Sequence, residues 1–312
     1  MEDYSTALQH ILNCCPDLRT YLNNYAVPSP GDWPTWFYQK KIIAQQTPEH
    51  ILVSLMPEQG PLHVSLNSQE DVISIYNFFF ARVHKDIFGS VLPHRPKPFR
   101  VQMLLMAVLC GWIMIREKVL RKFCMCKDLE FVCILHILEE VIPLVFFHYT
   151  VIFRSGALDS YFSVMFRFLL LFIIWERRHY DKSTLSMLSD LLHQKLNFPQ
   201  YYARKESFLT LFTEIKVEIW HSLLRSRTQP HHQASEIQES AQLLMGSRTG
   251  KALEENLTRT YNRGTGDKDL TLVAGKAAEI LLDIMQKIAQ NLGKSKEVSK
   301  IIEHYKMHKY IS

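Results

Sequence analysis

The stretch that decides the fold is residues 99–178, which opens with the run VQMLLMAVLCGWIMI, Val101–Ile115. Two further apolar runs follow, FVCILHILEEVIPLVFFHYTVIF at Phe131–Phe153 and YFSVMFRFLLLFIIW at Tyr161–Trp175. Charged residues end the first run, two glutamates and a proline interrupt the second, and Arg167 lies within the third. A membrane span needs about 20 apolar residues, and a central charge costs at least ~2.5 kcal/mol. The block therefore predicts buried helices of a soluble core.

The composition indicates a globular intracellular protein. Of 312 residues, 47% are hydrophobic and 21% are charged, which is close to the average for folded domains. The net charge of +5 permits an anionic partner but does not require one. The N-terminal sequence MEDYSTALQH lacks the basic and apolar regions of a signal peptide. We therefore expect the chain in the nucleus or the cytoplasm, without a membrane partner.

The six cysteines lie in or beside apolar runs, which predicts small, buried, reduced thiols in a reducing compartment. Cys124, Cys126, Cys133 and His136 would offer four ligands of the kinds that bind zinc. Their neighbours are apolar, however, and their spacing matches no common zinc knuckle. We therefore expect no structural metal and no cofactor, with Mg²⁺ as the exception if a complete acidic site were present.

Helical periodicity dominates the rest of the chain, so the predicted fold class is mostly α, with at most a few short strands at residues 50–66. A shift towards polar composition from Ser226 suggests a core at residues 1–225, followed by a polar linker and C-terminal helical segment at residues 226–312. Individual helices are expected at residues 4–26 with a break at Pro16, then at 36–44, 71–84 with Ser68 as N-cap, 184–193, 206–225, 235–257 and 270–288.

The acidic residue that attracts most interest is Glu218, on the predicted helix 206–225. His221 and Arg225 share its helical face, so the three side chains form a polar stripe on an otherwise apolar helix. The stripe has two interpretations. It is either part of a site, or the solvated face of an ordinary amphipathic helix.

Basic residues gather at two places, Arg177, Arg178 and Lys182 in one segment and Arg227 in the other. Lysine and arginine at such positions neutralise the phosphates of nucleic acid, so these four are our candidate nucleic-acid contacts. Short basic segments are also common at solvated helix ends. Both interpretations stay open at this point.

A set of motifs resembles landmarks in uncharacterised transposon-derived proteins, which are themselves similar to the C-terminal part of RNase H-like DDE transposases. The resemblance covers about residues 15–245, and the order and spacing of the motifs carry it. The motifs are PGDWP from Pro30, GPLHVSLN from Gly60, RPKPFR from Arg95, FRSG from Phe153 and EIWHSLLR from Glu218.

The resemblance implies a DNA-related origin and an α/β core with a helical insertion. It makes Asp32 and Glu218 the acidic candidates and places His63 beside the site. RNase H-like transposases use two or three carboxylates to hold two Mg²⁺ ions, and the segment Gly60–His63 contains no acid. An incomplete set cannot hold two metals, so we expect no catalysis. The resemblance also implies that Glu218, His221 and Asp32 approach one another at a shared polar cleft.

Two functions follow as alternatives. The first is an inactive, transposase-derived remnant, kept as a module that binds nucleic acid or proteins, with DNA as the expected nucleic acid and the C-terminal helices as a protein-binding surface. The second is a helical scaffold or interaction protein without a nucleic-acid role. A multi-pass membrane protein built from residues 99–178 is a third alternative, disfavoured by the charges in that block.

Overall fold

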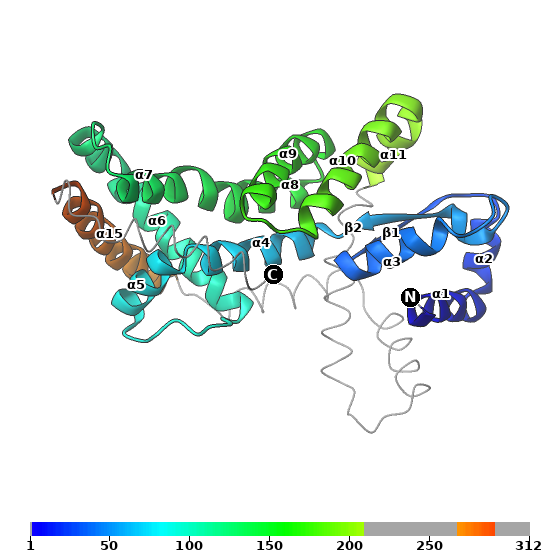
Figure 1. The fold of residues 1–312 in the computed structure, drawn as a ribbon, viewed down its shortest axis with the longest axis horizontal. Helices are drawn as coiled ribbons and strands as arrows, with labels where there is room; N and C mark the ends of the chain where they lie inside the picture. Colours follow the sequence, from blue (N-terminus) through cyan, green and yellow to red (C-terminus); the bar gives the residue numbers. More distant parts are fainter. Residues whose placement is uncertain (1, 209–266, 291–312) are drawn as a thin grey trace, which may run out of the picture. The chain divides into compact units, whose positions relative to one another are not determined.

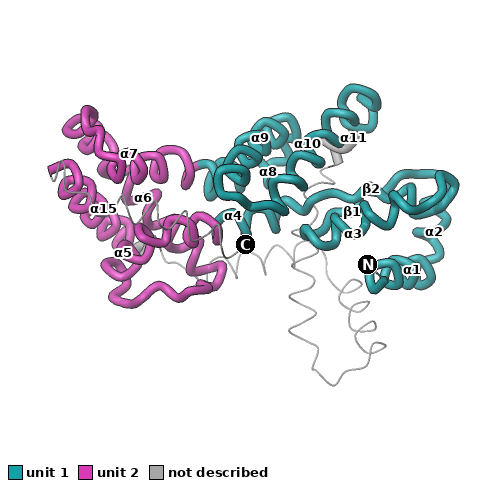
Figure 2. The backbone as a smooth tube through the Cα atoms, in the orientation of Figure 1, with its two compact units in different colours: residues 1–69, 144–214 teal, residues 70–143, 215–312 magenta. Residues whose placement is uncertain are grey.

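The computed structural model describes residues 2–208 and 267–290, and Figure 1 draws the remaining residues, 1, 209–266 and 291–312, in grey. The described residues are mostly helical, with one parallel sheet of two short strands, which confirms the predicted fold class. The chain forms two compact units, shown in separate colours in Figure 2. Unit 1 comprises residues 1–69 and 144–214, and unit 2 comprises residues 70–143 and 215–312. The predicted boundary at residue 225 lies outside the described residues.

Unit 1 begins with α1 (Glu2–Cys14) and α2 (Pro16–Leu22), which Pro16 separates as predicted. Proline is tolerated in the first turn of a helix but not in its interior. Both helices, α3 (Trp33–Ile43) and the 3₁₀ turn η1 (Ile51–Ser54) enclose a small core. Its buried members are Leu12, Leu22, Ile42 and Leu52.

The sheet of unit 1 pairs β1 (Val27–Gly31) with β2 (Leu55–Gln59) in parallel, in register from Val27 with Leu55 to Gly31 with Gln59. Proline is compatible with β1 because a two-stranded sheet has only edge strands, so each proline can face away from its partner. The sequence placed strands within residues 50–66 and missed β1, because its two prolines and its glycine are typical of a turn.

Two local predictions in this region are wrong. The run Leu62–Leu66 was expected to be extended, but it belongs to α4 (Pro61–Ile75). Ser68 was expected to be an N-cap, but it lies inside α4 and its hydroxyl donates to the carbonyl of Ser65 at 3.0 Å. A serine in mid-helix can satisfy its hydroxyl in this way without ending the helix.

The remainder of unit 1 is the helical stack formed by α8 (Tyr149–Ser155), α9 (Leu158–Ile174), α10 (Tyr180–Asn197) and α11 (Pro199–Phe208). The π-helical turn η3 (Pro143–His148) leads into it. Large rings fill its core, where the hydroxyl of Tyr149 donates to the carbonyl of Pro61 at 3.1 Å. The fully buried rings of this stack are Tyr149, Phe153, Tyr161, Phe168 and Phe172.

Unit 2 contains α5 (Asn77–Phe88), α6 (Pro98–Phe123), α7 (Leu129–His136), the π-helical turn η2 (Ile137–Val141) and α15 (Asp267–Gln290). The principal contact is between α6 and α15. Gly111 permits it, since a Cβ at this position would lie 2.7 Å from the backbone nitrogen of Ala278. The predicted apolar stripe of 270–288 is confirmed by buried residues along α15, namely Ala274, Ala277, Leu281, Ile284 and Ile288.

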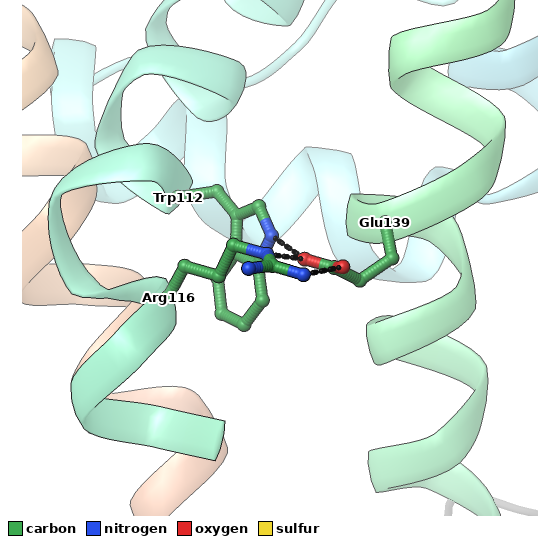
Figure 3. Close-up of polar contacts among 3 residues, drawn as sticks. All are labelled: Trp112, Arg116 and Glu139. Atoms are coloured by element: carbon green, nitrogen blue, oxygen red, sulfur yellow. Dashed lines mark hydrogen bonds and ion pairs between the residues drawn. The ribbon is translucent and has the colours of Figure 1, made fainter. Parts of the chain in front are cut away.

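A polar clamp also joins two elements of unit 2 (Figure 3). Glu139 accepts hydrogen bonds from the indole of Trp112 at 2.5 Å and from both Nε and a terminal nitrogen of Arg116 at 2.7 Å. The guanidinium of Arg116 is the main cause that holds the pKa of Glu139 below its usual value. The clamp connects α6 to η2, and a bidentate arginine–carboxylate pair fixes their orientation.

One helix bears on the membrane alternative. Within the described residues, α6 is the helix whose length and composition suit a membrane span, with an 18-residue window of mean hydropathy 1.7. We expected every apolar run in residues 99–178 to be too short to span a membrane. By length and composition, this expectation does not hold for α6. The core helix of a soluble protein meets the same criteria, so a single such helix is weak evidence for a membrane. The absence of a membrane partner stays a prediction.

Candidate nucleic-acid interface

Five aromatic rings of unit 1 form a continuous series, which we call the aromatic ladder: Tyr4, Tyr38, Phe37, Trp33 and His179. Successive ring centroids lie 4.8, 5.3, 5.2 and 4.2 Å apart. Three of the rings come from α3, one from α1 and one from the residue before α10. None of the five is buried. Phe37 and His179 are exposed, whereas Tyr4, Trp33 and Tyr38 are half-buried, and Tyr4 also packs against the small core of unit 1. Large rings usually contribute to a core, so a series that reaches the surface is the most distinctive feature of unit 1.

The sequence around α3 explains how the ladder is presented. Asp32 is the N-cap, and its carboxylate accepts a hydrogen bond from the amide of Thr35 at 3.0 Å. Trp33, Phe37 and Lys41 then follow at intervals of four residues, so they lie along one face of the helix. Trp36 and Ile42, which lie off this row, are buried. The helix therefore holds two rings and an exposed ammonium group in one row.

Two polar contacts hold α3 and α4 against α10 within unit 1. Lys40 forms an ion pair with Asp190 and donates to the hydroxyl of Ser186 at 3.3 Å. The amide of Asn67 donates to the phenol oxygen of Tyr180 at 2.7 Å. The α10 residues in both contacts follow His179 in the sequence, so the contacts hold the start of α10, and with it His179, close to α3 and α4.

The turn between α9 and α10 brings basic residues beside the ladder. Arg177, Arg178 and Lys182, which we call the basic junction, are all exposed. Glu176 ends α9 in a left-handed conformation with φ 53°, and the amide of Arg177 bonds to the carbonyl of Phe172 at 2.8 Å. The chain reverses at this point, so the basic junction flanks the exposed ring of His179.

The charge of this surface is moderate. Three cationic side chains in residues 176–182 stand beside two acidic ones, Glu176 and Asp181. Within the part of the chain that the structure describes, neither Arg178 nor Lys182 forms a side-chain ion pair. Lys41 adds a further exposed cation on the row of Trp33 and Phe37. The surface therefore combines ring faces with a few available cations.

The structure describes two of the site residues that the transposase resemblance implies, Asp32 and His63. Asp32 is a helix cap and has a structural role. His63 is half-buried on α4, where its carbonyl accepts from the amide of Asn67 at 2.8 Å. Glu218, His221, Arg225 and Arg227 lie outside the described residues, so the expected approach of Glu218 to Asp32 stays a prediction.

The basic residues predicted at Arg177, Arg178 and Lys182 do lie together, as one exposed segment. What the sequence analysis missed is the ladder beside them. The four-residue spacing of Trp33, Phe37 and Lys41 was the available signal, but on its own it is equally typical of a helix face that packs into a core. Only the three-dimensional contact with His179 connects this row to the basic junction.

Metal and thiol chemistry receive little support from the described residues. All six cysteines are free thiols, and burial raises the pKa of Cys133 and of Cys110. Among residues 2–208 and 267–290, no group of three or more His, Cys, Asp or Glu side chains is placed to hold a metal ion. None of the six cysteines is buried, and Cys14, Cys15 and Cys124 are exposed, so the prediction of buried thiols is wrong.

Comparison with protein-family models, with curated proteins and with solved structures finds no match to this chain. The functional argument therefore rests on the residues and contacts of the chain itself.

Proposed function

We propose that the protein is a non-catalytic binding protein, and that the aromatic ladder and the basic junction of unit 1 bind nucleic acid. The observation that supports this most is the series of five contacting rings, none of them buried, next to exposed arginines. Nucleic-acid bases stack on aromatic side chains, and lysine and arginine neutralise the neighbouring phosphates. Both kinds of group are present on this one surface.

The hydrogen-bonding around α3 supports a binding role over a catalytic one. Asp32, which directly precedes the ladder residue Trp33, is already engaged as a helix cap. Lys40 is engaged by Asp190. These groups maintain the geometry of α3, and the rings together with the exposed cations Arg178 and Lys182 are left to contact a ligand.

A transposon-derived origin is part of this proposal and rests on the sequence motifs. A remnant of such a protein would retain contact with DNA while it lacks the carboxylates that hold two metal ions. Residence in the nucleus or cytoplasm follows from the same proposal, because the ligand is found there.

Charge reversal tests the proposal most simply. Each cation that contacts a phosphate adds about 0.7 to the slope of log affinity against log salt for a single strand. We expect Arg178→Glu combined with Lys182→Glu to weaken binding of a fluorescein-labelled oligonucleotide by at least about tenfold and to reduce that slope by at least about 1.4. Fluorescence anisotropy over a salt series measures both quantities.

The matched control reverses two exposed lysines of α6 in unit 2, Lys118→Glu and Lys122→Glu. This variant has the same net charge as the test variant but leaves the basic junction intact. Equal loss of affinity in the two variants would mean that only net charge matters, and unchanged affinity in the test variant would remove the basic junction from the proposal.

The outward face of α9 favours a second candidate function, the helical interaction protein. Phe166, Leu170, Ile173 and Ile174 on this face are each at least 50% exposed. Exposed apolar patches often mark surfaces that bind proteins. Under this alternative, Leu170→Asp combined with Ile173→Asp abolishes an assembly that sedimentation velocity detects for the wild type. A wild-type chain that sediments as a monomer in cell extract and in buffer would argue against it.

A further inference from the structure

We infer that the aromatic ladder selects unpaired bases, so that its ligand is single-stranded DNA or RNA and not a duplex. This inference rests on the proposed nucleic-acid function and specifies the substrate class of the same surface. It follows from three features of the surface: the faces of its rings, the number of its cations and the shape of the element that carries them.

The rings provide the first argument. Trp33 and Phe37 lie with their centroids 5.2 Å apart at an angle of 11°, so they form a stacked pair on α3 in which Trp33 is half-buried and Phe37 is exposed. Phe37 is 38% exposed. A base inside a duplex is already stacked on both faces, whereas an unpaired base has a face free to stack on an exposed ring. Exposed ring faces therefore discriminate in favour of single strands.

The charge provides the second argument. The basic junction offers Arg177, Arg178 and Lys182, and Lys41 lies on the row of α3. Proteins that bind duplex DNA commonly contact many phosphates, and their affinity falls steeply with salt as a result. With two acidic residues also in the junction, this surface is poorly supplied with the charge that duplex binding relies on. Stacking must then contribute a large share of the affinity.

The element that carries the rings provides the third argument. Sequence readout in a duplex requires a helix or β-ribbon that enters the major groove with polar side chains directed to the base edges. The outward row of α3 consists of Trp33, Phe37 and Lys41, and the neighbouring Lys40 is paired with Asp190. This row has ring faces where groove-reading helices have polar groups, so it suits stacking on a flexible strand.

The experiment compares three labelled ligands of one sequence with the full-length protein: a DNA strand, the RNA strand, and the DNA strand annealed to its complement. We expect both single strands to bind at least about tenfold more tightly than the duplex. We also expect a salt slope of about −2 to −3 for the single strands, as three or four phosphate contacts would produce. Preference of DNA over RNA, or the reverse, identifies which source supplies the ligand.

An abasic DNA strand and two variants complete the test. We expect the abasic strand, which keeps the phosphates, to bind at least about tenfold more weakly than the normal strand. Phe37→Ala should weaken single-strand binding several-fold, while the control Phe166→Ala, which removes an exposed ring of α9 in the same unit, should leave it unchanged.

The outcomes separate this inference from the proposed function. Duplex binding equal to or tighter than single-strand binding, with sensitivity to Arg178→Glu and Lys182→Glu, would overturn the preference for unpaired bases and leave nucleic-acid binding in place. Equal affinity for the abasic and normal strands would overturn the preference in the same way. Absence of binding to every ligand at low salt would overturn both.

Discussion

Two helical surfaces of this protein are built from regularly spaced residues, but they differ in burial. The row of Trp33 and Phe37 on α3 in unit 1 consists of large rings that stay at the surface. The contact of α6 with α15 in unit 2 consists of small residues around Gly111 that are buried. Large apolar side chains normally provide the energy of a core, and small ones permit close approach of backbones. The contrast indicates that close packing holds α6 and α15 together in unit 2, and it motivates our proposal that the rings of unit 1 bind a ligand.

This comparison predicts a separation of effects. Substitutions in the α6–α15 contact should change the free energy of unfolding, and substitutions in the aromatic ladder should change ligand affinity. Three stability measurements can break or sharpen that separation.

The largest effect is expected for Gly111→Ala. The new Cβ would lie 2.7 Å from the backbone nitrogen of Ala278 and 2.8 Å from the Cβ of Ala277, so α15 must move away from α6. Overpacking of this kind typically costs 1–3 kcal/mol, and here the obstacle is backbone, so we expect a loss of at least about 2 kcal/mol in urea unfolding.

Gly275→Ala on α15 is the matched control. A Cβ there meets nothing within 4 Å, and alanine is favoured over glycine in a helix by about 0.5–1 kcal/mol. We therefore expect Gly275→Ala to stabilise the protein. Destabilisation of equal size in both variants would show that the close approach at Gly111 is not what holds the two helices.

An intermediate effect is expected for Glu139→Gln, which weakens the clamp with Arg116 and Trp112. We expect a loss of about 1 kcal/mol at neutral pH, because the carboxylate is partly exposed and solvent screens the pair. The pKa of Glu139 is lowered in the folded state, chiefly by its hydrogen bonds from Arg116. Its contribution is therefore complete above the unfolded pKa of about 4.3 and is lost as pH falls through the lower folded value.

Thermal unfolding of wild type and Glu139→Gln across this acidic range measures the pH dependence. The difference between the two proteins should be largest near neutral pH and should shrink at the acidic end. A difference that grows as the pH falls has the wrong sign for a carboxylate with a lowered pKa and would contradict the clamp.

The smallest effect on stability is expected for Phe37→Ser. The ring is exposed, and surface substitutions usually change the free energy of unfolding by no more than about 0.5 kcal/mol. Because Phe37 also contacts the rings of Trp33 and Tyr38, we expect a slightly larger loss of unfolding free energy, but still less than about 1 kcal/mol. Urea unfolding that shows a loss of 3 kcal/mol or more, as for deletion of a buried ring, would place Phe37 in a core and end the contrast between the two surfaces.

The sequence predicted the helices of both units better than their partners. Periodic apolar residues identified α15 and the helices of residues 99–178, since burial of one face follows directly from that spacing. The sequence did not predict β1, because Pro28, Pro30 and Gly31 are typical of a turn. These residues form a strand only through their pairing with β2, which lies further along the chain.

The candidate site was predicted in part. Exposed cations at Arg177, Arg178 and Lys182 are readable from local composition. The ladder is not, because it depends on a contact between Trp33 and His179, which are distant in sequence. A row of apolar residues on a helix can be buried against another element or exposed to solvent. The sequence of the row is the same in both cases, so only the tertiary structure distinguishes them.

The measurement that tests the central claim most directly is the affinity of Trp33→Ala for a single-stranded oligonucleotide, with thermal unfolding recorded on the same samples. Trp33 contacts both Phe37 and His179, so its removal separates His179 from the other rings of the ladder. We predict affinity reduced by about tenfold or more, consistent with the 1–3 kcal/mol that stacking contributes per base, an unfolding midpoint lowered by only a few degrees, and recovery of most of the affinity in Trp33→Phe. Wild-type affinity in Trp33→Ala, or equal losses in Trp33→Ala and Trp33→Phe, would contradict the account.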